Sequence, residues 1–436
     1  MGRARSGVLG LIGGSRPTPQ LLWIPVAAAL LIQALLFFTT QPEIAYDSAS
    51  YMAQAESLAA TGSARNELGE PDTVRTPGYP LFLSVFLAAK LGYAGAIAAQ
   101  RALWIIVVAV TTWASFRLTG SSVTAVVAGT ITAIDLPALQ ATNSILTETL
   151  ATVFVGASVL QAYRASNTGQ TAAALAAGVI AGVAALVRPV ALLLGVPLVL
   201  AIWIAGTRAA RGRVATAIVV ASLAVSGTWI GRNYLQTGVA TFSSISAVNM
   251  LLFRAAGTLA IRDPGGIDAN IQKRQAELED AACRAAEARF GRDCKSVPIS
   301  LRATLYDSLA LPIIFADPIA TAMLAGRAFV MIMFGGGANL LAVMTGIPES
   351  SARIVALGYT VPLAALALVG LSYWWRVDRL AATMMLLTVL YFVVMSLGAE
   401  AYSRFRVPIL PLYAVLAGGG AAALAERWRG VSASAE

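Results

Sequence analysis

The stretch LLWIPVAAALLIQALLFFTT, residues 21–40, is followed directly by QPEIAYDSASY, residues 41–51. A helix needs about 20 apolar residues to cross a hydrocarbon core of roughly 30 Å, and the first stretch supplies them. The second stretch is polar and carries two carboxylates, Glu43 and Asp47. Together they predict a membrane helix that ends at an aqueous loop with acidic side chains.

The composition of the whole chain agrees with a membrane protein. Of its 436 residues, 58% are hydrophobic and 12% are charged, and the mean hydropathy is +0.73. An ordinary soluble domain carries about 25% charged residues. The net charge of +9 sits in short loops between apolar stretches, which is typical of membrane topology, so we expect no nucleic-acid partner. Because the chain has no histidine, a histidine-ligated zinc or a Ser–His triad is excluded, and any general base must be a carboxylate.

Further apolar runs of spanning length recur along the chain, giving about ten spans with an expected range of about nine to twelve. The sequence therefore predicts an all-α, polytopic membrane protein. The runs lie at about 21–40, 100–117, 122–140, 148–164, 171–188, 190–206, 214–231, 353–375, 380–398 and 407–425.

The arginines in short loops indicate the orientation, because such loops are enriched in positive charge on the cytoplasmic side. A cytoplasmic leader with Arg3, Arg5 and Arg16 places most loop arginines on its own side and the acidic loops outside. The arginines on the leader's side are Arg117, Arg164, Arg208, Arg211, Arg213, Arg376, Arg379, Arg427 and Arg429. The expected organisation is a cytoplasmic leader (1–20), an N-terminal transmembrane module (21–231) with a first external loop (41–99), a long external loop (232–352), C-terminal transmembrane helices (353–425) and a cytoplasmic tail (426–436).

The two external loops contain helices of their own. Residues 77–92 are too short to span comfortably and predict an interfacial helix. Residues 268–290 alternate in charge, as a solvated helix does. We interpret 319–343, which contains a triple glycine, as an interfacial or re-entrant segment. Cys283 and Cys294 lie in the long loop, where either a local disulfide or two free thiols is possible.

Two carboxylates at the outer face are candidate catalytic groups. If the chain after Asp47 is helical, Asp47 and Tyr51 share a face, and Asp47 could remove a proton from an acceptor hydroxyl. Alternatively, Asp47 only caps a helix that begins at Ser48. Glu148 follows the third run and could instead be a partner in a cap formed by Thr147. Asp135 lies deeper in that run, where a carboxylate is costly unless it is paired or faces a cavity.

Arginines at the same face form the other half of the pattern, because guanidinium groups bind phosphate through paired hydrogen bonds. The alternative for any one of them is a salt bridge between spans. The candidate phosphate ligands are Arg75, in the turn TVRTPGYP (73–80), with Arg188, Arg404 and Arg406. The candidate substrate-pocket residues are Tyr51, Tyr79, Arg232, Asn233 and Tyr402.

These motifs in this order resemble the GT-C superfamily, and are most similar to its bacterial group related to dolichyl-phosphate-mannose:protein mannosyltransferases and aminoarabinose transferases. The resemblance extends from the first span to the last. The stretches that carry it are Asp47-x-x-x-Tyr51, Arg75-Thr-Pro-Gly-Tyr-Pro, Thr147-Glu148, Leu186-Val-Arg-Pro189, Trp229-x-x-Arg-Asn233 and Ser403-Arg-Phe-Arg-Val-Pro408.

The resemblance implies a glycosyltransferase that passes a sugar, with inversion, from a polyprenyl-phosphate donor to an acceptor at the outer face of the bacterial cytoplasmic (inner) membrane. In the family the catalytic aspartate lies in the first external loop, which corresponds to Asp47, and a second acid corresponds to Glu148. The last arginine motif, Arg404 and Arg406, corresponds to the ligands of the donor phosphate. In the eukaryotic protein mannosyltransferases the corresponding aspartate is followed directly by a second acid, whereas Asp47 is not. A lipid or a glycan is therefore an alternative to a protein as the acceptor.

Other classes fit parts of the pattern. A transporter or lipid flippase would suit ten spans with scattered arginines, but it should show internal repeats or broken helices, and the sequence shows no repeat. An O-antigen-type polymerase or ligase also uses polyprenyl-linked sugars. We expect no obligate cofactor; a hard ion such as Mg²⁺ or Mn²⁺, held by Asp47 and Glu148, is the alternative.

Overall fold

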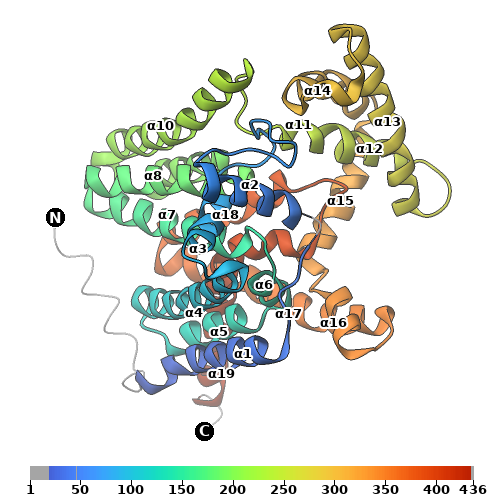
Figure 1. The fold of residues 1–436 in the computed structure, drawn as a ribbon. Helices are drawn as coiled ribbons and strands as arrows, with labels where there is room; N and C mark the ends of the chain where they lie inside the picture. The colour runs from blue at the N-terminus through green and yellow to red at the C-terminus, as the bar shows by residue number, and fades with distance from the viewer. Residues whose placement is uncertain (1–18, 46, 434–436) are drawn as a thin grey trace.

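The computed structural model describes residues 19–45 and 47–433 (Figure 1). Within these ranges the chain is helical, and extended backbone pairs only at two isolated bridges, Glu43 with Ser144 and Arg65 with Pro71. The all-α class predicted from the sequence is confirmed. The basic leader with its three arginines lies outside the described residues.

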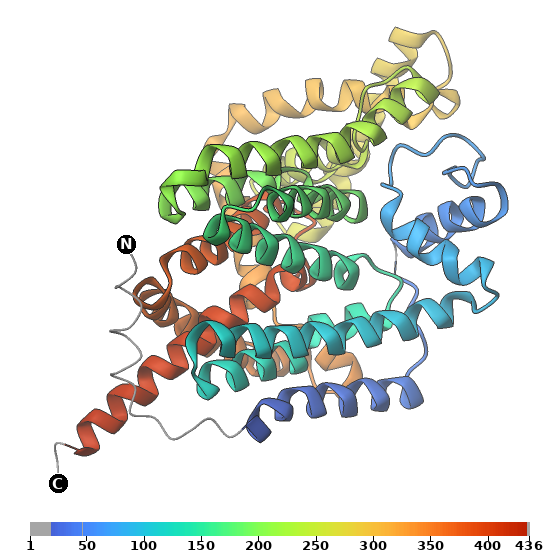
Figure 2. The ribbon, with the colours of Figure 1, turned by 90° about the vertical axis from the view of Figure 1, so that its left-hand side faces the viewer.

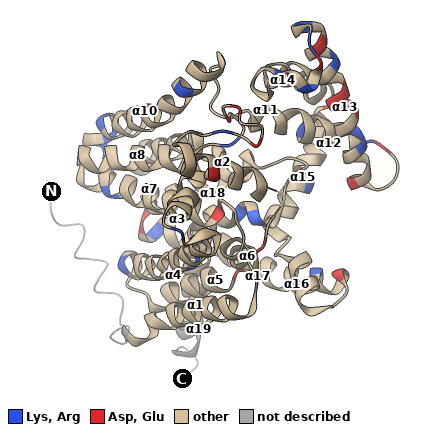
Figure 3. Cartoon of the chain, in the orientation of Figure 1, with Lys and Arg blue, Asp and Glu red and all other residues tan. Residues whose placement is uncertain are grey.

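Most helices run side by side in one bundle, with α2 and the loop after it at one end (Figure 2). Charged side chains are sparse along these helices and collect at helix ends and on α13 (Figure 3). The bundle elements are η1 (Pro19–Leu22), α1 (Trp23–Thr39), α4 (Gly92–Thr119), α5 (Ser122–Ile134), α6 (Leu136–Asn143), α7 (Glu148–Thr168), α8 (Thr171–Val187), η2 (Pro189–Leu193), α9 (Gly195–Ala205), η3 (Arg208–Ala210), α10 (Arg211–Thr237), α17 (Glu349–Val377), α18 (Arg379–Met395), η6 (Ser403–Ile409) and α19 (Leu410–Ala433).

The remaining helices belong to the two regions expected outside the membrane. The interfacial helix expected at 77–92 is present as α3, and the charged helix expected at 268–290 is present as α13. The elements of these regions are α2 (Ser48–Thr61), α3 (Gly78–Ala88), α11 (Ile245–Asn249), η4 (Met250–Ala255), α12 (Ala256–Ala260), α13 (Ile267–Phe290), η5 (Cys294–Ser296), α14 (Ile299–Ala316), α15 (Pro318–Phe334) and α16 (Ala338–Thr345).

Fewer helices reach spanning length than the ten runs in the sequence. Six described helices are long and apolar enough to cross a membrane, or eight if each of two bent pairs counts as one span. The difference arises because several runs form shorter helices; α8 and α18 have 17 residues each and α9 has 11. One of the six is α14, which the sequence analysis placed inside the external loop.

Both bent pairs fall where the sequence signals a break. The third run divides at Asp135, which is followed by Leu136 and Pro137, and α5 and α6 meet there at 52°. The segment expected to be interfacial or re-entrant forms α15 and α16, which meet at 50° around Gly335–Gly337. Glycines permit this sharp turn, since Gly336 and Gly337 both have positive φ.

Small residues bring the last helices of the bundle into close contact. A Cβ on Gly370 of α17 would collide with the Leu416 carbonyl oxygen of α19, so only glycine permits this approach. Beside it, the buried Trp374 indole donates a hydrogen bond to the Val415 carbonyl oxygen at 2.9 Å. This contact fixes α19 and therefore the arginine-bearing segment η6 that precedes it.

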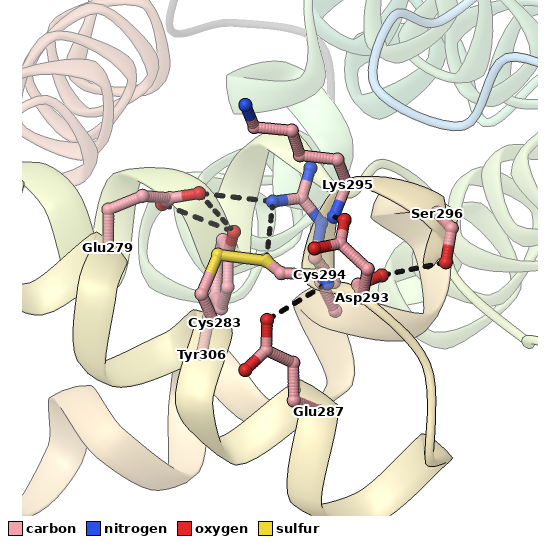
Figure 4. Close-up of a disulfide and its surroundings, with 9 residues drawn as sticks. Glu279, Cys283, Glu287, Asp293, Cys294, Lys295, Ser296 and Tyr306 are labelled. Atoms are coloured by element: carbon pink, nitrogen blue, oxygen red, sulfur yellow. Dashed lines mark hydrogen bonds and ion pairs between the residues drawn. A yellow bond between two sulfur atoms is a disulfide. The ribbon is translucent and has the colours of Figure 1, made fainter.

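A disulfide stabilises the region around α13 (Figure 4). Cys283 of α13 is bonded to Cys294 of η5, with 5.1 Å between their Cα atoms, which decides between the two states left open by the sequence. Nearby, Glu279 of α13 accepts hydrogen bonds from Arg302 at 3.1 Å and from the Tyr306 hydroxyl at 3.3 Å. Covalent and polar contacts thus join α13 to α14.

Replacing both cysteines with serine should loosen this region without unfolding the bundle. A cross-link closing a short loop restricts the unfolded chain and contributes about 2–3 kcal/mol. We expect faster proteolytic cleavage between α13 and α14, measured by limited digestion. A reductant should have the same effect on the unmodified protein and none on the double variant; equal cleavage of all four samples would contradict the prediction.

Candidate active site

Five charged side chains from separate parts of the chain meet at the end of the bundle that carries α2. They are joined by ion pairs into one network, which we call the Asp47 cluster. Its members are Asp47, Arg75, Glu148, Arg188 and Arg404.

Asp47 lies at the centre of this cluster. Its Oδ1 accepts a hydrogen bond from Arg75 at 2.9 Å and its Oδ2 accepts one from Arg404 at 2.8 Å. Asp47 occupies the N-cap position of α2, but its side chain makes no capping hydrogen bond. The capping alternative therefore does not account for this side chain, which is 26% exposed and accessible to a substrate.

Contacts with α2 hold the Arg75 guanidinium in place. Its Nε donates to the Ser50 hydroxyl at 2.9 Å, and a second nitrogen donates to the Tyr51 hydroxyl at 3.2 Å. The guanidinium carbon also lies 4.6 Å from the centre of the Tyr51 ring. As expected from the i, i+4 spacing, Asp47 and Tyr51 lie on one face of α2, and Arg75 contacts both.

The turn that carries Arg75 is fixed from both sides. The buried Asp72 accepts hydrogen bonds from the backbone N–H groups of Val74 and Arg75 at 2.7 and 3.2 Å. After the turn, Gly78 packs against the backbone of Leu186 so closely that an added Cβ would lie 2.7 Å from it. Glycine is required for this approach, which places the turn beside the end of α8 and thus near Arg188.

Glu148 anchors the arginines from the inner side of the cluster. It is only 1% exposed, and its Oε1 lies 3.0 Å from Arg188 and 3.8 Å from Arg404. Thr147, the N-cap of α7, makes no capping bond and instead accepts a hydrogen bond from Arg188 at 2.7 Å. The centre of the Phe405 ring lies 5.1 Å from the guanidinium carbon of Arg188 and 5.5 Å from that of Arg404.

The charges of the cluster do not balance. Three guanidinium groups share two carboxylates, so each arginine has an ion-pair partner but the five side chains together carry a net charge of +1. Burial acts to raise the pKa of Asp47, but Arg75 and Arg404 outweigh it and hold that pKa below its ordinary value. Asp47 is therefore ionised, and an incoming anion would complete the charge balance.

Arg406 lies outside this cluster, although the sequence analysis placed it with the phosphate ligands. Its side chain is 1% exposed and lies 2.5 Å from Asp135, which is fully buried. Arg406 also donates to the Met333 carbonyl oxygen at 2.9 Å, and Tyr359 donates to Asp135 at 3.4 Å. In the 3₁₀ segment η6, three residues make a turn, so arginines two positions apart point to different sides. Asp135 thus has the partner that its depth requires.

The predicted pocket residues divide in the same way. Tyr51 contacts the cluster, whereas the buried Tyr79 donates to Gln100 at 2.7 Å and packs edge-on against Tyr51. Tyr402 is 55% exposed just before η6. Arg232 and Asn233 bind loop backbone instead: Arg232 donates to the carbonyl oxygens of residues 64 and 72, and Asn233 donates to that of residue 241.

Several residues of the site were not identified from the sequence. Ser50 and Asp72 act only through neighbours, and the sequence analysis gave them no role. Phe405 stands inside the quoted motif Ser403-Arg-Phe-Arg-Val-Pro408, but only the arginines of that motif were given a role. The pairing of Asp135 with Arg406 was signalled only by the depth of Asp135. Among the described residues, no group of three acidic or cysteine side chains is placed to hold a metal ion. The expectation of no obligate cofactor, with Mg²⁺ or Mn²⁺ as the alternative, stays a prediction.

Comparison with known proteins extends the fold assignment. No family model matches the chain, and no curated protein does. Among solved structures, the archaeal oligosaccharyltransferase AglB from Archaeoglobus fulgidus, in complex with an inhibitory peptide and a dolichol-phosphate, matches 92% of this chain with a TM-score of 0.52 and 12% identity. ArnT from Cupriavidus metallidurans in the apo state matches 92% of this chain and 77% of its own, with a TM-score of 0.43 and 15% identity.

The chain shares the fold of AglB over 92% of its own residues. The resemblance inferred from the motifs is thereby confirmed at the level of fold alone. At 12% identity the likeness shows the fold and not the activity. This chain covers about half of the AglB chain, 50% of its length.

Removing the charge of Arg406 alone should destabilise the protein strongly. Arg406→Met leaves the buried Asp135 carboxylate unpaired, which typically costs about 3–5 kcal/mol. Adding Asp135→Asn removes the second charge, while an oxygen remains to cap α6 at Ala138. We expect thermal unfolding of the purified protein to show a large loss for the single variant and substantial recovery for the double variant. Equal loss in both would contradict a paired-charge role.

Proposed function

We propose that this protein is an inverting glycosyltransferase that moves a sugar from a polyprenyl-phosphate donor to an acceptor hydroxyl at the outer face of the membrane. The observation that carries this proposal is the position of Asp47, an exposed carboxylate held between two arginines in a cluster with surplus positive charge. Such a cluster offers one base and one anion site side by side.

The arginines suit the donor's phosphate. Phosphate is a good leaving group once its negative charge is spread over hydrogen-bond donors that are already in place. Arg404 and Arg188 flank Phe405 and are 25% and 17% exposed, so both can present nitrogens to a ligand. We assign these two residues, with Arg75, to the phosphate.

Asp47 is the base in this mechanism. The acceptor oxygen attacks the anomeric carbon, the bond from that carbon to the phosphate oxygen breaks, and its electron pair leaves with the phosphate. The acceptor proton passes to Asp47. One base suffices for this single displacement, whereas retention would need a second carboxylate as nucleophile. Glu148 is too buried for that role, and we assign it to positioning Arg188 and Arg404.

Donor binding would also activate the base. In the structure Arg75 and Arg404 both bind Asp47, which lowers its pKa and makes it a weak proton acceptor. A donor phosphate competes for the same guanidinium groups and neutralises part of their charge. The pKa of Asp47 then rises toward the range of an effective base. Proton removal is thus linked to the presence of the donor.

The fold and the charge pattern support the remaining parts of the proposal. The likeness in fold to AglB, whose structure is in complex with a dolichol-phosphate, supports a polyprenyl-phosphate donor. The loop arginines favour a position of the cluster on the extracytoplasmic side of a bacterial inner membrane. Analysis of the reaction product would identify the sugar, which is a hexose or a pentose, and the acceptor, which is a lipid, a glycan or a protein.

A transporter or lipid flippase is the second candidate. It is favoured by the two broken helix pairs, α5 with α6 and α15 with α16, because broken helices form substrate sites in many transporters. A flippase moves its lipid without a base, so it does not need the Asp47 carboxylate for chemistry.

Asp47→Asn should abolish sugar transfer while the protein still folds. Loss of a general base lowers a rate about 10²–10⁴-fold, and asparagine retains the size and the hydrogen-bonding oxygen. The measurement is mass spectrometry of cell-envelope glycans and lipids from a deletion strain that expresses each full-length variant. The matched control is Glu67→Gln, an exposed carboxylate in the same loop. A fully active Asp47→Asn protein would reject the transferase mechanism.

Arg75→Gln should move the acidic limb of the pH profile of kcat/KM to higher pH. Burial raises the pKa of Asp47 and the arginines lower it, so removing one arginine lets that pKa rise. A larger fraction of Asp47 is then protonated at a given acidic pH, and the rate falls there. The control is Arg292→Gln in the exposed turn after α13. An acidic limb that stays in place would contradict the coupling of Arg75 to the base.

A further inference from the structure

A hollow opens at the surface apart from the Asp47 cluster, and no step of the proposed reaction uses it. Its volume is about 340 Å³, and it lies between the end of α2, the loop 62–77 and the end of α10. The residues that matter for its chemistry are Arg65, Pro71, Pro77, Trp229, Arg232 and Gln236.

This hollow is distinct from the Asp47 cluster. Asp47 precedes the first residue of α2, whereas the hollow is lined by Leu58 and Gly62 at the other end of that helix, about 20 Å away at 1.5 Å per residue. The segment 72–77 lies between them. Arg75 reaches from it to Asp47, and Pro77 contributes to the wall of the hollow.

The charged residues that line the hollow are both cations. The backbone of the loop fixes Arg232, which donates to the carbonyl oxygens of Ala64 at 2.6 Å and Asp72 at 2.7 Å. Arg65 donates to the Gly69 carbonyl oxygen at 2.7 Å and is otherwise exposed. The carboxylate of Asp72 is engaged by backbone N–H groups of its own turn. The walls therefore offer hydrogen-bond donors and positive charge.

Trp229 forms an apolar wall of the hollow and supports Arg232. Its ring stacks under the Arg232 guanidinium, with 4.6 Å between the guanidinium carbon and the ring centre. The side chain is 8% exposed and its indole nitrogen is buried, so the ring, and not the N–H, is what Trp229 offers to a ligand.

Size and surroundings narrow the chemistry of the ligand. A volume near 340 Å³ is at the lower end of small-molecule sites, which span about 300–1,000 Å³, and exceeds the needs of a bare oxyanion. Prolines and Trp229 supply apolar walls for a carbon skeleton. On α10, the neighbouring Tyr234 and Leu235 are 57% and 83% exposed, as residues that face lipid are.

We propose that this hollow binds a phosphate ester of a small polyol, with the phosphate on Arg65 and Arg232 and the carbon skeleton against Pro71, Pro77 and Trp229. Glycerol phosphate has this chemistry, either as a soluble molecule or as the headgroup of an anionic phospholipid in the adjacent leaflet. This site does not depend on the proposed transferase reaction.

The test is calorimetric titration of the purified full-length protein with two probes, soluble glycerol phosphate and short-chain phosphatidylglycerol. Short-chain phosphatidylcholine, which carries no net charge, is the reference lipid. We expect saturable binding of at least one probe, weakened about tenfold or more by Arg65→Gln. The exposed control Arg292→Gln should bind like the unmodified protein.

Each outcome either supports or overturns the proposed site. Binding of both probes identifies the phosphate ester itself as the ligand, binding of phosphatidylglycerol alone identifies a lipid source, and binding of glycerol phosphate alone identifies a soluble source; each supports the site. No saturable binding of either probe overturns it. Equal affinity in Arg65→Gln and Arg292→Gln, with unchanged melting temperatures, overturns it as well.

Discussion

The structure depends on how the carboxylate of Asp47 is stabilised beside a membrane. A charge taken from water must be paired, and here two arginines pair it, one 28 and the other 357 residues further along the chain. Arg75 arrives on a turn that Asp72 and Gly78 hold rigid, and Arg404 arrives on a 3₁₀ segment fixed by α19. Because Asp47 needs both arginines, the first external loop and the segment before the last helix must be brought together. The bundle between them holds both in position.

Much of the fold was predictable from local pattern. Apolar runs marked the bundle, alternating charges marked α13, and the triple glycine Gly335–Gly337 marked one of the two bends. The bend at Asp135 was not predicted, because the run 122–140 was interpreted as one span. Helix lengths were less predictable, because the run 190–206 divides between η2 and α9 and the run 171–188 forms a helix of only 17 residues. The possible disulfide between Cys283 and Cys294 could be stated, but their approach depends on how α13 packs.

The sequence identified most residues of the site, but not how these residues are arranged in space. Residue type and position singled out Asp47, Arg75, Glu148, Arg188 and Arg404, which meet. The same reasoning grouped Arg406 with Arg404, although the twist of η6 turns it into the core toward Asp135. Linear proximity is a poor guide where the backbone rotates by a third of a turn per residue. Arg232 likewise has the expected chemistry but lies in another part of the surface.

The pairing of Asp47 with Arg404 joins positions 357 residues apart. A ribosome therefore releases nearly the whole polypeptide before both partners exist, and insertion of the final helix is the event that assembles them. A fragment that ends before η6 could still pair Asp47 with Arg75 but would lack the second ion pair, from Arg404. The complete Asp47 cluster therefore forms only after the segment that precedes α19 has been made.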